Sequence, residues 1–151
     1  MKYLFPCLLL AFCLGSCSKR VYTMQSVGFI SEQKGTITIR STGFGRNVDE
    51  AMNSAEQYAF ELLLFRGLPG SQQTIPLVGI DEATFKFHYK QYFQELLTDG
   101  RYKTFLLSSI PVSDFAKHAR SQRNIIMDVR INIIALRSDL ETHGIIRKYG
   151  Y

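Results

Sequence analysis

The side chains that could carry chemistry are cysteines and histidines, and their positions limit what that chemistry can be. The chain has three histidines on three different predicted elements, which are His88, His118 and His143. No H-E-x-x-H motif, H-x-x-H motif or carboxylate pair at metal-ligand spacing occurs, so we expect no catalytic metal and no cofactor. The three cysteines all lie within the first seventeen residues. Thiol chemistry at the N-terminus is therefore the one specific reaction that the sequence indicates.

The N-terminal segment has the form of a secretory signal peptide. Lys2 precedes an apolar run over residues 3–14, which ends in two small residues. The run is shorter than the ~18–20 residues that a membrane-spanning helix needs. Residues 14–17, Leu-Gly-Ser-Cys, resemble the lipobox of bacterial lipoproteins. In that family the thiol of the cysteine is alkylated with diacylglycerol, and a peptidase then cuts before it.

The lipobox resemblance implies that residues 1–16 are removed and that Cys17 becomes a lipidated N-terminus. Cys7 and Cys13 would leave with the signal peptide, so disulfides and cysteine-based metal sites are excluded. Ser18 follows Cys17, where some envelopes use Asp as an inner-membrane retention signal. We therefore expect a lipid-anchored protein of the cell envelope, at the outer membrane and facing the periplasm. The alternative is an ordinary secretory signal with a chance cysteine.

Composition and charge exclude several other classes of protein. The chain has 151 residues, 46% hydrophobic and 13% aromatic, which is too apolar for a disordered protein and suits one folded domain. The formal net charge of +5 comes from cations spread along the chain, with no basic block. This distribution favours a solvated surface of mixed charge, and we expect no nucleic-acid partner.

The first half of the mature chain predicts a tether, a strand and a helix. Residues 17–34 are polar and irregular and form the expected tether, with an edge strand near residues 27–30. Residues 36–42 alternate and are rich in β-branched side chains, which predicts a strand that Gly43-Phe44-Gly45 ends. Asn47 can cap a helix that runs to about Arg66 and closes at Gly67. That helix carries a stripe suited to close packing, formed by Ala51, Ala55 and Ala59.

The second half predicts a helix over residues 81–97, strands over residues 102–112 and 124–136, and a last helical turn from 138 to 144. The polar connection over residues 113–123 can hold a short helix. Polar and apolar residues alternate along the late strand, so one of its faces should be exposed to solvent and the other buried. The order strand, helix, helix, strand, strand, helix predicts one α+β domain over residues 35–151, an antiparallel sheet with helices packed on one face.

The predicted helix over residues 81–97 has an aromatic face, formed by Phe85, Tyr89, Tyr92, Phe93 and Leu96. Such a face is usually part of a core, and we expect Tyr92 to lie at the boundary while the others pack inward. The alternative is a face on which a ligand stacks. The candidate interaction surface comprises Tyr92, Tyr89 and the neighbouring His88.

The chain also resembles a group of small envelope proteins. A strand ending in S-T-G-F-G, a helix with A-x-x-x-A-x-x-x-A and a late strand running into I-I-A-L-R-S-D-L-E are similar to lipoproteins of the Lpp-twenty type. The same features resemble the N-terminal domain of flagellar assembly protein T. Residues 68–97 depart from the short form of that family. The resemblance implies an accessory or structural role in the envelope, without catalysis.

Two hypotheses about function follow. The leading one is a non-enzymatic lipoprotein, attached to membrane lipid through acylated Cys17, that presents its domain to another envelope protein. The alternative is a lipoprotein that binds a small molecule or glycan with the aromatic helix and the loop over residues 67–79. A closed aromatic core favours the first hypothesis, and an open aromatic-lined pocket favours the second.

Overall fold

The computed structural model describes residues 27–119 and 122–148. The predicted signal peptide over residues 1–16 and the lipidation site Cys17 lie outside the described residues, as does the tether up to residue 26. The elements follow in the order β1 (Val27–Gln33), β2 (Thr36–Gly45), α1 (Val48–Phe65), α2 (Glu82–His88), α3 (Lys90–Phe93), the π-helical turn η1 (Gln94–Thr98), the 3₁₀ turn η2 (Arg101–Phe105), β3 (Leu106–Pro111), β4 (Ala116–Ala119), β5 (Gln122–Asn132) and α4 (Ile133–Thr142).

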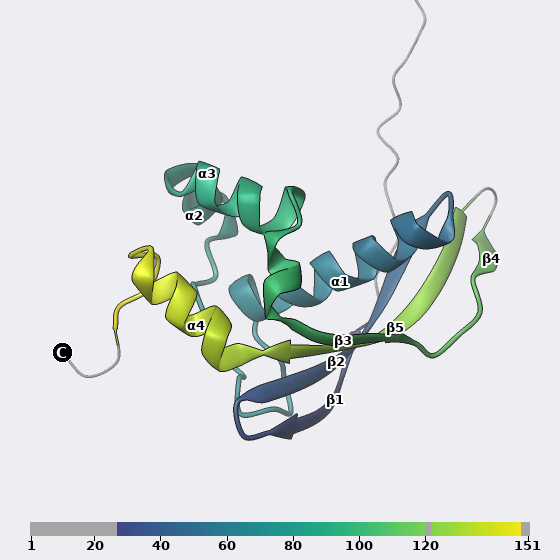
Figure 1. The fold of residues 1–151 in the computed structure, drawn as a ribbon, viewed down its shortest axis with the longest axis horizontal. Helices are drawn as coiled ribbons and strands as arrows, with labels where there is room; N and C mark the ends of the chain where they lie inside the picture. The colour runs from purple at the N-terminus through teal and green to yellow at the C-terminus, as the bar shows by residue number, and fades with distance from the viewer. Residues whose placement is uncertain (1–26, 120–121, 149–151) are drawn as a thin grey trace, which may run out of the picture.

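The strands form one antiparallel sheet in the order β1-β2-β5-β3, with β4 also paired to β5. Figure 1 shows α1 lying across this sheet, with α2 and α3 at the end of the molecule away from β4. The predicted fold class, α+β with an antiparallel sheet, is confirmed. None of the helices in the described part of the chain is long and apolar enough to cross a membrane.

The central pair β2–β5 builds the core by alternation. Ile37 pairs with Ile131 and Ile39 with Val129, and all four side chains are fully buried. On the opposite face the Arg40 guanidinium donates two hydrogen bonds to the Asp128 carboxylate, at 2.7 and 2.8 Å. One face of the sheet therefore belongs to the core and the other carries polar groups, as the alternation of the late strand predicted.

Strand β2 continues through Gly45, so the prediction that Gly43-Phe44-Gly45 ends the strand was wrong. The glycines let α1 approach the strand closely. A Cβ on Gly43 would lie 2.0 Å from the Ala51 carbonyl oxygen, and one on Gly45 would lie 2.5 Å from the Ala51 nitrogen. The alanine stripe of α1 is fully buried against this surface. The packing role predicted for the alanines is confirmed.

The ends of α1 are those that the sequence predicted. The Asn47 side chain accepts a hydrogen bond from the Glu50 N–H at 2.8 Å. The Glu50 carboxylate accepts from the Arg46 N–H at 3.0 Å, which satisfies a further donor at the N-terminus. After Arg66, the chain turns at Gly67 with φ +74, a conformation that favours glycine.

Several predicted boundaries differ from the structure. The sheet begins at Val27, before the predicted domain boundary at residue 35, because β1 pairs with β2 along its length. The strand predicted over residues 102–112 is confirmed only from Leu106 to Pro111, because residues 102–105 belong to η2, where Tyr102 and Phe105 turn into the core. The connection over residues 113–123 holds strand β4, paired to β5, instead of a helix. The late strand ends at Asn132, whose side chain accepts from the Ala135 N–H at 3.0 Å and thereby starts α4.

Candidate binding pocket

The helix predicted over residues 81–97 is broken at Tyr89, and this break shapes the candidate site. Tyr89 has φ −112 and ψ 39, between the end of α2 and the start of α3. The π-helical turn η1 then follows α3 and buries both Leu96 and Leu97. The helical segment ends at Thr98, one residue beyond the predicted end at residue 97, and Gly100 follows at φ +85.

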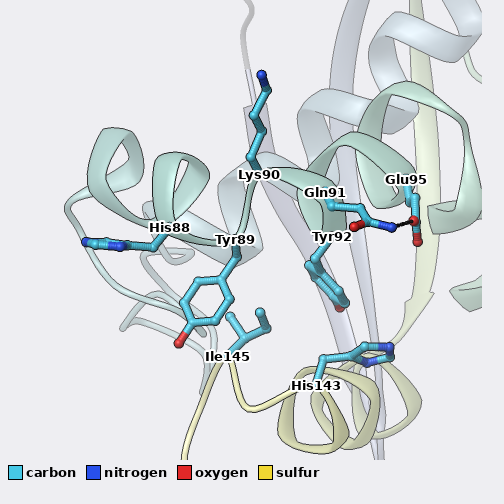
Figure 2. A pocket seen from close by; sticks show the side chains of 8 residues that line it. All are labelled: His88, Tyr89, Lys90, Gln91, Tyr92, Glu95, His143 and Ile145. Atoms are coloured by element: carbon cyan, nitrogen blue, oxygen red, sulfur yellow. Dashed lines mark hydrogen bonds between the residues drawn. The ribbon is translucent and has the colours of Figure 1, made fainter.

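A surface pocket of about 430 Å³ lies between the α2–α3 junction and the C-terminal end of α4. We call it the α3–α4 pocket (Figure 2), and it is lined by His88, Tyr89, Lys90, Gln91, Tyr92, Glu95, His143 and Ile145. The three residues of the predicted interaction surface, His88, Tyr89 and Tyr92, thus lie at one pocket. The loop over residues 67–79, which the ligand-binding alternative invoked, does not line it.

Tyr92 is a buried wall of this pocket, so its expected place at the boundary was wrong. The side chain is 8% exposed, and its hydroxyl donates to the Asp139 carboxylate at 2.6 Å. The Arg101 guanidinium carbon lies 4.8 Å from the ring centroid, and the His143 ring lies at 4.9 Å. Burial, followed by the hydrogen bond to Asp139, raises the pKa of Tyr92 well above its ordinary value. This tyrosine is neutral, fixed and covered by its neighbours.

Asp139, on α4, holds the pocket wall together. Its two carboxylate oxygens accept from Arg101 Nη1 at 3.0 Å each, in addition to the Tyr92 hydroxyl. Its backbone carbonyl lies 2.8 Å from His143 Nδ1. Because a carbonyl oxygen can only accept a hydrogen bond, Nδ1 of His143 carries the proton. Nε2 is then the ring nitrogen that remains available to a ligand or partner. Asp139 therefore orients a tyrosine and an arginine through its side chain and a histidine through its backbone carbonyl.

Hydrogen bonds also fix the side chains at the rim of the pocket. The Tyr89 hydroxyl donates to the Gly144 carbonyl at 3.2 Å, and the Tyr89 ring lies nearly parallel to Phe85 at 6.4 Å between centroids. The Gln91 amide donates to the Glu95 carboxylate at 3.0 Å. The side chains of His88 and Lys90 are exposed, and Figure 2 shows both extending away from His143.

Sequence reasoning missed Lys90, Gln91 and Glu95, which lie beside the predicted residues on the same segment. It also missed the pocket residues that come from elsewhere in the chain, namely from η2, from α4 and from the segment directly after α4. His143 and Ile145 line the pocket, while Asp139 and Arg101 support it from behind. No local pattern marks them, because their contacts with Tyr92 and Tyr89 join segments far apart in the chain. The packing that brings two of the histidines to one pocket is a tertiary property.

Within residues 27–119 and 122–148, no group of three or more His, Cys, Asp and Glu side chains could hold a metal ion. A comparison of the chain with protein-family models, curated proteins and solved structures finds no match.

Proposed function

We propose that this protein is a bacterial envelope lipoprotein with a non-catalytic accessory role. Acylated Cys17 attaches it to membrane lipid, at the outer membrane on the periplasmic side, and its α+β domain binds another envelope protein through the α3–α4 pocket. The observation that carries the proposal is the internal hydrogen bonding of the pocket, in which the Tyr89, Tyr92 and His143 side chains are all fixed by partners within the domain.

This arrangement supports binding better than catalysis. A nucleophile or general base needs a reactive atom that meets the substrate and a neighbouring group that activates it. The Tyr92 hydroxyl instead donates into a carboxylate that already neutralises Arg101. A pocket whose groups hold each other offers a preformed shape, and preorganisation of this kind lowers the entropy lost on binding.

Most aromatic rings at or beside the pocket are already covered by other side chains of the domain, which favours a protein partner over a ligand that stacks on an exposed ring. Tyr92 packs against Arg101 and His143, and Phe93 is buried against Phe65 at 5.3 Å between ring centroids. Tyr89 is half-buried and is the one tyrosine of the pocket with ring surface to offer. A small-molecule or glycan ligand is the second candidate, because the pocket is open at the surface, is partly lined by aromatic rings as that hypothesis expected, and has a volume of about 430 Å³, within the range of ligand sites.

The membrane anchor is tested by Cys17→Ser in cells given labelled palmitate. We expect the wild-type chain to incorporate label and to sediment with membranes, and the variant to do neither. An alanine substitution at the exposed Ser138 serves as the control and should behave as wild type. Labelling that persists in the Cys17→Ser chain would contradict the lipid anchor.

The binding site is tested by placing a photo-reactive amino acid at His88, on the exposed rim, in intact cells. We expect one cross-linked envelope protein, and we expect Tyr89→Ala in the same chain to abolish the product. The matched position is Ser138, which is exposed on α4 outside the pocket lining. Equal products from both positions would contradict the assignment of the site, and a glycan-containing product from His88 alone would select the second candidate.

A further inference from the structure

The side chains of the α3–α4 pocket leave hydrogen-bond acceptors free, while their donors are largely used inside the domain. Nδ1 of neutral His143 donates to a backbone carbonyl of α4, which leaves Nε2 as an acceptor. The Glu95 carboxylate accepts from the Gln91 amide through Oε1, and its other oxygen has no partner in the part of the chain that the structure describes. The Tyr89 hydroxyl donates to the Gly144 carbonyl. These groups therefore suit a guest that donates hydrogen bonds.

The pocket also holds a negative charge that no cation neutralises. Glu95 forms no ion pair within residues 27–119 and 122–148, because its one hydrogen-bond partner there is a neutral amide. Asp139, in contrast, is neutralised by Arg101. The C-terminal end of α4, where the last carbonyls carry partial negative charge, lies at the same pocket. Lys90 lines the pocket too, but Figure 2 shows its ammonium extending away from the other labelled side chains. The charge that faces a guest is therefore negative.

Tyr89 provides the open aromatic surface of the pocket. The Tyr92 ring already has the Arg101 guanidinium at 4.8 Å and the His143 ring at 4.9 Å from its centroid. The Tyr89 ring stacks on Phe85 at 6.4 Å, and the side chain is only half-buried. Part of the Tyr89 ring therefore stays open to a flat group that enters the pocket.

The domain already holds one guanidinium with a ring and a carboxylate. Arg101 lies over the Tyr92 ring and donates to the Asp139 carboxylate at 3.0 Å. The pocket presents the same two groups a second time, as the ring of Tyr89 and the carboxylate of Glu95. In the described part of the chain, no arginine is paired with this second carboxylate. The guest that this arrangement matches is an arginine from another molecule.

We propose that the α3–α4 pocket binds an arginine side chain of the partner protein. This inference rests on the proposed function and names the chemistry of the group that enters the pocket. The flat guanidinium lies on the open part of the Tyr89 ring and donates to His143 Nε2 and to the Glu95 carboxylate. A guanidinium carries several N–H donors in a fixed fork, so it can serve acceptors on two elements, whereas an ammonium is a compact point charge.

The guest is tested by NMR on the full-length chain, purified in detergent from the fraction that contains it, with labelled tyrosine and histidine rings. The probe is acetyl-Gly-Arg-Gly-amide, and its citrulline analogue keeps the size and the flat end group without the charge. We expect the arginine peptide to shift the ring signals of Tyr89 and His143. It should bind about tenfold more tightly than the citrulline peptide, which corresponds to about 1.4 kcal/mol. The lysine analogue should bind about threefold more weakly than the arginine peptide, because its ammonium has no flat face. The glutamate analogue should cause no shift.

Two matched pairs of variants locate the contacts. Glu95→Gln should weaken binding of the arginine peptide about threefold, as expected for an exposed ion pair. Asp114→Asn removes an exposed carboxylate outside the pocket lining and should leave binding unchanged. Tyr89→Leu should weaken binding about threefold through loss of the ring surface, whereas Tyr89→Phe keeps the ring and should bind nearly as wild type.

The inference would be overturned by equal affinity for the arginine peptide and its citrulline or lysine analogue, by glutamate-peptide shifts at the same rings, or by unchanged binding in Glu95→Gln. A cross-linked protein from His88 with no preference for the arginine peptide would overturn this inference and leave the proposed function standing. Arginine-specific binding by a chain that gives no cross-link in cells would support the inference and contradict the proposed function.

Discussion

The two halves of this domain share one hydrophobic core and differ in the contacts that are added to it. In the sheet half, formed by β1, β2, β5 and α1, buried aliphatic side chains and close backbone approach join the helix to the sheet. In the helical half, formed by residues 82–105 and α4, the elements are short, and hydrogen bonds and an ion pair around Asp139 add to the buried apolar packing of side chains such as Phe93, Leu96 and Leu140. The candidate pocket lies in the helical half.

The difference shows why the pocket lies where it does. Apolar packing fills space, so the β2–α1 contact leaves no room for a guest next to Gly43. The polar network holds side chains at a distance set by hydrogen-bond geometry, and it can keep a recess open between Tyr89 and His143. Substitutions that remove apolar packing and substitutions that remove the polar network should therefore differ in their effects on stability and on local opening.

The largest effect is expected for Phe93→Ala, because Phe93 joins the two halves. Its ring is buried against Phe65 of α1 and lies edge-on to Tyr92. We expect the free energy of unfolding to fall by about 3–5 kcal/mol, as for other large aromatic truncations in cores. Phe87→Ala removes the same group from an exposed position and should change the free energy by less than about 0.5 kcal/mol. Chemical denaturation measures both, and similar losses would mean that Phe93 does not link the halves.

The close approach in the sheet half is tested by Gly43→Ala. The added Cβ would meet backbone atoms of Ala51 and Ala55, which cannot move aside unless α1 leaves the sheet. We expect a loss of about 3 kcal/mol, at the upper end of overpacking effects. Gly28→Ala, in β1, adds the same methyl group where no atom lies within 4 Å. Its stability should equal or slightly exceed that of wild type, and equal thermal midpoints for the two variants would contradict the packing argument.

The polar network of the helical half is tested by Asp139→Ala. The substitution leaves the Tyr92 hydroxyl and the Arg101 guanidinium without their acceptor, and two other nitrogens of Arg101 are already buried without a hydrogen-bond partner in the described part of the chain. We expect a loss of about 2 kcal/mol. Hydrogen exchange should show faster opening of α3 and α4, with β2 and β5 unchanged. Asp114→Ala, at an exposed position, is the control, and uniform acceleration across the sheet would show that the two halves open together.

The parts of the fold that sequence patterns predicted belong to the sheet half. The alternation of β5 and the cap and alanine stripe of α1 are local periodicities, and each survives in the structure because one buried face dominates it. The two glycines of β2 were interpreted as a strand end, since glycine weakens strands locally. Their actual role is to admit the backbone of α1, which appears only when the two elements are packed.

The helical half could not be predicted to the same extent. Residues 81–97 have continuous helical spacing, and nothing in that spacing marks the break at Tyr89. The contacts that accompany the break, from Tyr89 to Gly144 and from Tyr92 to Asp139, join residues 55 and 47 positions apart. The boundary at Asn132 was also hidden from local patterns. Strand β5 ends at this residue and its side chain caps α4, although the surrounding residues form one apolar run. The candidate residues His88, Tyr89 and Tyr92 were named from one helix, while His143 and Ile145 entered only through tertiary packing.

The smallest expected effect concerns alkaline pH, and it compares two tyrosines that each donate to a carboxylate. Burial raises the pKa of Tyr92, with the hydrogen bond to Asp139 adding to it, and burial raises the pKa of Tyr102, with the charge of Glu56 adding to it. The unfolded chain releases these protons near pH 10, whereas the folded chain retains them. Between pH 9 and 11 the unfolded state therefore binds fewer protons than the folded state, and stability falls by about 1 kcal/mol for each tyrosine. Below pH 9 the contribution is fully present.

Tyr92→Phe and Tyr102→Phe should each make the decline of stability with pH shallower, while other groups titrate equally in variant and wild type. Urea denaturation at a series of pH values measures the slope, and an unchanged slope in Tyr92→Phe would show that the pocket tyrosine ionises as readily in the folded chain as in the unfolded one.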